Sequence, residues 1–450
     1  MGQRVRVLRV RGFRYLLLGQ AASLIGDQAA IVALALFVTR RTGSASDLGL
    51  VLGAQAVALA LLVLLGGVWA DRLPRRRIMI SADLARAALH LTLAVLILTG
   101  GVRLWHVIAI EAAFGCAEAF FAPAFSGLLP QTVPEELIAP AAGLAQAADN
   151  ASLLIGPAVA TALVTTAGAG AAFMLDAATF LLSAALLRRV TPRPRGDNVS
   201  AARVLHDLPA GWRIVRERAW VWVTIVAFSS VLFCTLAPWV VLGPAIARHL
   251  FGPSSPYGVL SALIGSGALS GALIGARAHS RWPLRTGLLL LLAWPLYGSA
   301  LALGAPFWIA APLAVAAGAG WALMRVWWQT ALARRIPGDA LSRVSAIDLT
   351  GSLVLLPVGY VLAGPLARTI GARTVLGAGA AIAFVIIMLA VARQPDRSVP
   401  AGQRCEAIAA DAAASPTTDS AELGTVASAR PYQEVCAQSL TSTAAPSTTS

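Results

Sequence analysis

The chain has 450 residues, of which 58% are hydrophobic and only 12% are charged. Soluble domains carry charge on about a quarter of their residues, so this composition excludes an ordinary soluble protein and indicates a polytopic membrane protein. The net charge of +14 comes from arginine alone, since the sequence contains no lysine. Such a basic balance also occurs in nucleic-acid-binding proteins. Here the arginines lie in short segments between apolar stretches, so we expect a lipid bilayer and no nucleic acid.

Apolar stretches long enough to cross a bilayer follow one another along the chain. A helix of about 20 residues spans the hydrocarbon core. We predict spans at residues 15–38, 47–70, 78–99, 104–127, 138–166, 170–188, 219–247, 256–277, 284–303, 306–333, 341–367 and 371–392. Only the segment "LGPAIARHLFGPSSPYG" separates the seventh span from the eighth. The predicted fold is therefore an all-α polytopic membrane protein with twelve transmembrane helices in two six-helix bundles.

The distribution of arginine predicts the orientation of the chain. Most arginines lie at the N-terminus and in the segments after the second, sixth, eighth and tenth predicted spans. The opposite side holds only Arg40, Arg41, Arg103, Arg248, Arg368 and Arg373. Because cytoplasmic loops are enriched in basic residues, we expect a multi-pass protein of the cell inner (cytoplasmic) membrane with both termini in the cytoplasm. The basic N-terminus resembles a signal peptide, but no cleavage site follows it, so we predict a retained first span.

Breaker-rich and low-complexity segments divide the chain. The segment "TPRPRGDN" opens a central loop, and the last residues are rich in Ala, Ser and Thr. We predict a cytoplasmic N-terminus at 1–14, an N-terminal bundle at 15–189, a cytoplasmic loop at 190–218, a C-terminal bundle at 219–393 and a disordered cytoplasmic tail at 394–450. The two bundles share weak internal similarity: Pro134 aligns with Pro337 and Gly67 with Gly271, whereas Asp71 falls on Gly275. Two related halves are typical of transporters that bind substrate at the midplane.

Residues 66–77, "GGVWADRLPRRR", resemble the loop signature of the major facilitator superfamily. The segments "TGSASDLGLV", "ISADLARA", "LIGDQ", "VPEELIAPAAGL" and "AGAAFMLDAATFLLSAALL" are similar to the drug–proton antiporter branch, which includes macrolide-efflux proteins and the enterobactin exporter. The resemblance covers residues 10–230 well and 231–393 more weakly. It implies a secondary transporter that works by alternating access and exchanges protons for a lipophilic substrate.

The resemblance also implies a cytoplasmic gate around the loop between the second and third spans. Asp71 is expected near the start of the eleventh span, where a helix N-terminus favours a carboxylate and latches the halves together. Asp83 and Arg86 are three residues apart on one helix face and are expected to pair with each other or with the loop. The alternative is a basic loop that only sets topology. The predicted gate residues are Gly67, Asp71, Arg72, Arg75, Arg76, Arg77, Asp83 and Arg86.

Ionisable residues inside the predicted spans are candidates for proton coupling, because buried charge is costly in lipid. Asp27 and Glu118 lie near the middle of their spans and are expected to carry the proton. The alternatives are a helix-packing hydrogen bond for Asp27 and a polar pore wall for Glu118. Drug exporters of the superfamily often carry arginine in the fourth span, which here carries two glutamates instead. Arg325 is expected to pair with Asp348, and the alternative is a counter-ion to an anionic substrate. The candidate coupling or cavity residues are Asp27, Glu111, Glu118, Asp149, Arg325 and Asp348.

Two further patterns point to the transport pathway. By resemblance, Gly143, Ser152, Gly156 and Pro157 match the antiporter signature of the fifth span, which implies a hinge or seal; tight helix packing is the alternative. Aromatic residues suit a cavity for a lipophilic compound, although Trp and Tyr also mark bilayer interfaces. The predicted cavity aromatics are Phe120, Phe121, Trp239, Trp321 and Tyr360.

The chemistry of an enzyme is missing from the sequence pattern. None of the five histidines pairs with a second ligand at metal spacing, and no phosphate-binding loop is present. We therefore expect no metal and no cofactor. We also expect a monomer, and the resemblance implies that it moves a lipophilic small molecule in exchange for protons. Export of a siderophore or lipid on the same scaffold remains an alternative, and a polytopic membrane enzyme is a third.

Overall fold

The computed structural model describes residues 2–193, 212–213, 215–252, 256–278, 280, 282–336, 344, 347–348, 351 and 355–394. The chain divides into two units, residues 1–394 and 395–450, and the second lies outside the described residues. The predicted tail beyond Gln394 and most of the predicted central loop therefore lie outside the described residues.

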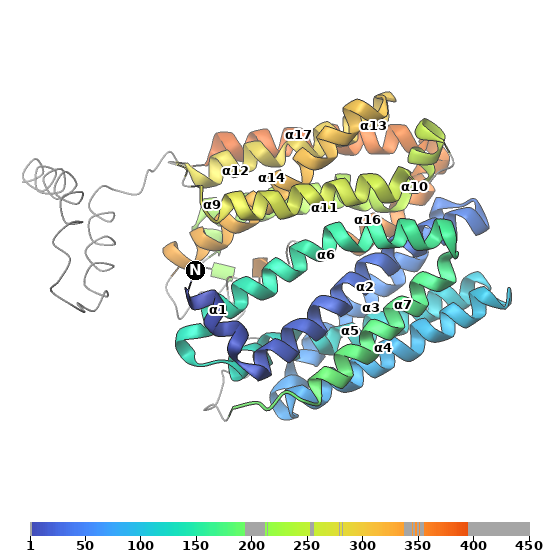
Figure 1. The fold of residues 1–450 in the computed structure, drawn as a ribbon. Helices are drawn as coiled ribbons and strands as arrows, with labels where there is room; N and C mark the ends of the chain where they lie inside the picture. Colours follow the sequence, from blue (N-terminus) through green and yellow to red (C-terminus); the bar gives the residue numbers. More distant parts are fainter. Residues whose placement is uncertain are drawn as a thin grey trace, which may run out of the picture. The chain divides into compact units, whose positions relative to one another are not determined.

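Every regular element of the described residues is a helix (Figure 1). The N-terminal half contains α1 (Gly2–Arg9), α2 (Arg11–Thr42), α3 (Ala45–Arg72), α4 (Arg75–Leu98), α5 (Leu104–Thr132), the short 3₁₀ turn η1 (Glu135–Leu137), α6 (Ile138–Thr166) and α7 (Ala169–Leu187). The C-terminal half contains α9 (Ala219–Val231), the π-helical turn η2 (Leu232–Leu236), α10 (Ala237–Phe251), α11 (Pro256–Gly275), α12 (Pro283–Leu291), α13 (Ala293–Leu303), α14 (Phe307–Arg335), α16 (Leu356–Ile370) and α17 (Ala372–Arg393).

The helices confirm an all-α polytopic membrane fold. The described residues include eleven helical segments long and apolar enough to cross a membrane. The remaining predicted span, 341–367, overlaps α16, and most of its first part lies outside the described residues. The weakly supported separation of the seventh and eighth spans is confirmed, because α10 ends at Phe251 and is followed by Gly252, whose φ of 93° suits glycine.

Two spans depart from the uniform helices that hydropathy predicts. The seventh runs through α9, η2 and α10, and its middle turn is π-helical. The ninth is divided into α12 and α13 around Leu292. Pro295 lies four residues after Leu291 and has no N–H to donate to that carbonyl, which accounts for the break.

The connections at one end of the helices share a turn chemistry. The six loops that join α2 to α3, α4 to α5, α6 to α7, α10 to α11, α13 to α14 and α16 to α17 each contain a glycine with positive φ. Side chains are strained in this backbone region, so glycine ends the helix there. These residues define what we call the glycine end: Gly43, Gly100, Gly168, Gly252, Gly304 and Gly371. We call the opposite end, which includes the loop after α3, the arginine end.

The most extensive contacts between the two halves run along two helix pairs. Helices α6 and α11 lie side by side (Figure 1), and a Cβ atom on Gly265 would stand only 1.9 Å from the carbonyl oxygen of Leu153. Helices α3 and α16 approach as closely, since a Cβ on Gly49 would stand 2.2 Å from the carbonyl oxygen of Tyr360. Glycine lets the backbones meet at these points. The first contact lies at the middle of its two helices, and the second lies closer to the glycine end, near the start of α3.

Candidate functional site

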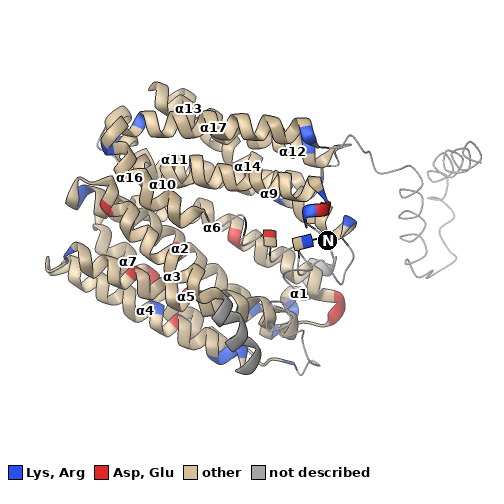
Figure 2. Cartoon of the chain, turned by 180° about the vertical axis from the view of Figure 1, so that it is seen from behind, with Lys and Arg blue, Asp and Glu red and all other residues tan. Residues whose placement is uncertain are grey.

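The N-terminal half contains charged side chains in its interior. Figure 2 shows acidic and basic segments within the length of its helices, not only at their ends. Asp83 and Asp176 are fully buried, and Arg86, His90 and Glu111 are at most 3% exposed. The side chain of Asp27 is 23% exposed and reaches the same cluster. We call this set the buried charge network: Asp27, Asp83, Arg86, His90, Glu111 and Asp176.

Arg86 of α4 is the central cation of this network. Its Nη2 donates a hydrogen bond of 2.6 Å to Oδ1 of Asp83, and its Nη1 lies 3.9 Å from Oδ2 of Asp27 on α2. The guanidinium carbon lies 4.2 Å from the ring centre of Phe180 and 4.3 Å from that of Phe121. A cation between aromatic faces and carboxylates is stabilised without water. Arg86 therefore joins α2 to α4 through charge.

His90 lies one turn beyond Arg86, between two acids. Its Nδ1 is hydrogen-bonded to Oδ2 of Asp176 on α7, and its Nε2 lies 3.6 Å from Oε1 of Glu111 on α5. The imidazole stacks on Phe114 with ring centres 4.3 Å apart and an angle of 10° between the planes. His90 was not among the site residues predicted from the sequence. The spacing of Asp83, Arg86 and His90 on one helix face was the available signal.

A glycine of α2 sets the position of the network against α7. A Cβ on Gly26 would stand 2.3 Å from Oδ1 of Asp176 and 2.4 Å from Oγ1 of Thr179. Thr179 also donates a hydrogen bond of 2.7 Å to the carbonyl oxygen of Asp176. Because Gly26 has no side chain, the next residue, Asp27, is held beside Arg86 and Asp176.

Glu118 lies near the network but is less buried. It is half-buried on α5, and the side chain of Gln55 on α3 lies within hydrogen-bonding reach of its carboxyl group. Asp27 and Glu118 are thus the partly exposed carboxyls, whereas Asp83, Glu111 and Asp176 are enclosed by helices. The described residues include no group of His, Cys, Asp or Glu placed to hold a metal ion.

The predicted gate divides into separate parts. The expected pair of Asp83 and Arg86 is confirmed, and it lies two to three turns inside α4, where helix packing buries it. Arg75 and Arg76 donate to the carbonyl oxygens of Gly127 at 2.9 Å and Val190 at 2.8 Å, while Arg77 is exposed. These bonds hold the start of α4 against the ends of α5 and α7, within one half. The structure describes neither the surroundings of Gly67 nor the side chains of Asp71 and Arg72, so the latch between halves stays a prediction.

The fifth-span motif combines tight and open positions. A Cβ on Gly156 would stand 2.3 Å from Cβ of Gln28 on α2, whereas one on Gly143 would meet nothing within 4 Å. Ser152 is buried and donates 2.7 Å to the carbonyl oxygen of Asp149, whose carboxylate accepts a 2.8 Å bond from Gln146. The carbonyl oxygen of Pro157 accepts a 2.7 Å hydrogen bond from the hydroxyl of Thr161 on the same helix. Packing thus requires glycine at position 156 and not at position 143.

In the C-terminal half the predicted site residues lie on different faces. Arg325 is exposed on α14, on the same face as Trp321 and Trp328, which pack on Phe228 and Trp220 of α9. Trp328 donates a 2.9 Å hydrogen bond to Asp348. Among the predicted cavity aromatics, Phe120, Trp321 and Tyr360 are half-buried. Trp239 and Phe121 are at most 5% exposed, so in this structure they pack inside their bundles instead of lining open space.

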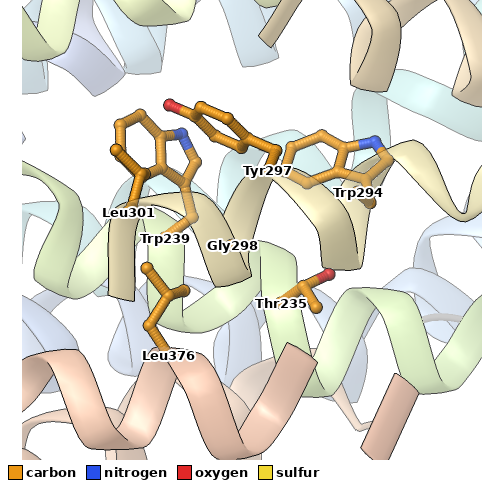
Figure 3. Close-up of a pocket in the computed structure, with 7 residues that line it drawn as sticks. All are labelled: Thr235, Trp239, Trp294, Tyr297, Gly298, Leu301 and Leu376. Atoms are coloured by element: carbon orange, nitrogen blue, oxygen red, sulfur yellow. The ribbon is translucent and has the colours of Figure 1, made fainter. Parts of the chain in front are cut away.

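Trp239 belongs to a cluster of aromatic residues beside the π-helical turn (Figure 3). Its ring centre lies 5.1 Å from that of Tyr257 and 5.2 Å from that of Tyr297. The hydroxyl of Tyr297 and the indole N–H of Trp294 are buried without a hydrogen-bond partner among the described residues. The side chains leave no room for a water molecule between them. Such unpaired donors are uncommon in protein interiors.

Comparison with known proteins agrees with this arrangement. The model of the Major Facilitator Superfamily matches residues 16–353. Macrolide efflux protein A of Streptococcus pyogenes is 26% identical over 361 residues, covering 78% of this chain and 88% of that protein. Multidrug efflux pump Tap of Mycolicibacterium fortuitum is 27% identical over 370 residues, covering 77% and 87%. The solved structure of the nucleoside transporter NupG shares the fold, with a TM-score of 0.66, 14% identity and coverage of 85% and 99%. The chain therefore belongs to the major facilitator superfamily of membrane transporters and is not an enzyme.

Proposed function

We propose that the protein exports lipophilic drugs or natural products, macrolides among them, in exchange for protons. The efflux proteins of Streptococcus and Mycolicibacterium support this substrate class, because the chain aligns with most of their length. The orientation we propose places the arginine end and both termini in the cytoplasm, in agreement with the distribution of basic residues. Contacts between the halves near the glycine end then correspond to a state closed toward the outside.

The observation that carries proton exchange is the contact between Asp27 and Arg86. Asp27 is the partly exposed carboxyl of the network, and its Oδ2 lies 3.9 Å from the buried guanidinium. When Asp27 is ionised, it attracts Arg86 and draws α2 toward α4; when it is protonated, Arg86 is left to Asp83. Proton binding is thereby converted into a change of helix contact, which alternating access requires.

An acidic substrate is a second candidate, favoured by Arg325. This guanidinium is exposed on α14 between two tryptophans, an arrangement that suits a carboxylate attached to an apolar body. An anionic siderophore or lipid would satisfy it, whereas a macrolide amine would not. Competition by such anions against macrolide transport distinguishes the two candidates.

Uptake of radiolabelled erythromycin into proteoliposomes with an acidic interior tests the proposal. Protons leaving the vesicles should drive the macrolide inward, and an uncoupler should abolish the accumulation. Asp27→Asn should reduce gradient-driven uptake to the level of protein-free vesicles without lowering protein yield. Asp47→Asn, at the start of α3, is the matched control and should transport normally. Accumulation that persists with the uncoupler, or in Asp27→Asn, would remove the proton or Asp27 from the mechanism.

A further inference from the structure

We propose that His90, Asp176 and Glu111 form a second proton-binding site, distinct from Asp27, and that each transport cycle loads and empties it. The proposal rests on the proton exchange proposed above. It concerns residues of α4, α7 and α5 that lie behind Asp27, enclosed by the N-terminal bundle. None of the three side chains is more than 3% exposed.

The two ring nitrogens of His90 both face carboxyl oxygens. Nδ1 is hydrogen-bonded to Asp176, while Nε2 lies 3.6 Å from Oε1 of Glu111. Both Nε2 and this Oε1 are buried and make no hydrogen bond to any described residue. The two unsatisfied atoms point at each other just beyond bonding distance. A small tilt of α5 relative to α4 would close the bond, so its strength depends on the conformation of the bundle.

Counting protons shows why this trio binds one. A neutral imidazole has a single N–H and donates to one acid only, which leaves its other lone pair facing a carboxylate. The arrangement becomes favourable when one more proton is present, either on the ring or on one of the two carboxyls. In each case the trio holds two protons and carries one negative charge. The extra proton belongs to the three groups jointly and is the one we assign to transport.

The other charged groups around His90 connect this proton to the partly exposed carboxyl of Asp27 on α2. Arg86, Asp83 and Asp27 face the trio from α4 and α2, and Glu118 lies two turns along α5 from Glu111. Asp176 is also adjacent to Gly26, the residue before Asp27. A proton that leaves the Asp27 carboxyl for the Asp176–His90 pair leaves Asp27 as a carboxylate, which then pairs with Arg86. The total charge of the network is unchanged by this transfer.

Aromatic rings separate the trio from water. Phe114 stacks on His90. The ring centre of Phe180 lies 6.2 Å from that of His90 and 4.2 Å from the guanidinium carbon of Arg86. Phe173 closes the site from α7, with its ring centre 5.3 Å from the imidazole. Because these rings exclude solvent, the trio exchanges protons through Asp27 and its neighbours instead of directly with bulk water.

The proton-to-substrate ratio tests the proposal. In proteoliposomes loaded with labelled erythromycin, the pH gradient that just balances the drug gradient reports how many protons accompany each molecule. His90→Gln should lower this ratio by one and should retain erythromycin counterflow, which moves no net proton. His249→Gln, an exposed histidine of α10, is the matched control and should keep the wild-type ratio. An unchanged ratio in His90→Gln would overturn the second site and leave the trio a packing contact.

A second measurement does not depend on the substrate. The nitrogen NMR signals of labelled histidine, assigned with His90→Gln, report whether the ring is protonated, and carboxyl infrared bands report Asp176 and Glu111. The proposal requires one extra proton on this trio near neutral pH, which Asp176→Asn should displace. A neutral ring beside two ionised carboxyls would overturn it. Wild-type protein that holds the proton but moves no erythromycin would refute the proposed function and not the proton site.

Discussion

The two halves of the protein bury polar groups in opposite ways. In the N-terminal half, α4 presents Arg86 and His90 to acids on three neighbouring helices, and Asp83 of the same helix pairs with Arg86. In the C-terminal half, Trp294 and Tyr297 bury donors that have no hydrogen-bond partner among the described residues, and Arg325 is exposed. The difference indicates that one bundle is organised by electrostatics and the other by aromatic packing. In our proposal the N-terminal half handles protons.

Removing the central cation should produce the largest loss. Arg86→Met leaves Asp83 and Asp27 without their partner, and breaking a buried ion pair in this way costs about 3–5 kcal/mol in the free energy of unfolding. Steric trapping in lipid bicelles measures this free energy. Adding Asp83→Asn to the variant should recover part of it, because one uncompensated charge is removed.

Arg325→Met is the matched change in the other half. Its side chain is exposed, so the free energy of unfolding should stay within about 0.5 kcal/mol of the wild type. Equal losses in the two variants would contradict the contrast between a charge-organised and an aromatic half.

A methyl group at Gly26 should have the next largest effect. The added Cβ would collide with Asp176 and Thr179, and overpacking of this kind costs about 1–3 kcal/mol. Gly26→Ala should also reduce proton-driven transport, because Asp176 is displaced from His90. Gly143→Ala in α6 is the control: its Cβ meets nothing, so helix propensity should raise stability by up to about 1 kcal/mol. Similar losses in both variants would mean that the contact at Gly26 carries no special constraint.

The smallest effect is expected at Tyr297. Its hydroxyl is buried and has no hydrogen-bond partner among the described residues, so deleting it removes an unfavourable group. Tyr297→Phe should leave the free energy of unfolding unchanged or raise it by about 1 kcal/mol. A clear loss on the same bicelle assay would show that the hydroxyl is paired within the membrane, and that the C-terminal half also contains a polar network.

Hydropathy predicted the helices well because the bilayer imposes their length. The sixth span was expected at 170–188 and α7 covers Ala169–Leu187; the fifth was expected at 138–166 and α6 covers those residues. The break at Leu292 was missed because a proline inside an apolar run does not change its hydropathy. Polar residues within spans were recognised as candidates and the pair of Asp83 with Arg86 was predicted, but partners on other helices were not. His90 and Asp176 are far apart in the sequence, and only packing of α4 on α7 brings them together.

The six glycine turns have a mechanical consequence. The connections at the glycine end are as short as residues 43–44, 167–168 and 371, so they contain almost no slack. Two helices joined by such a turn cannot slide along each other and must tilt together as a stiff hairpin. If the halves rock, the protein moves as six such levers, each pivoting near its glycine. The displacement should therefore be smallest at these turns and should grow along each helix toward the opposite face of the membrane.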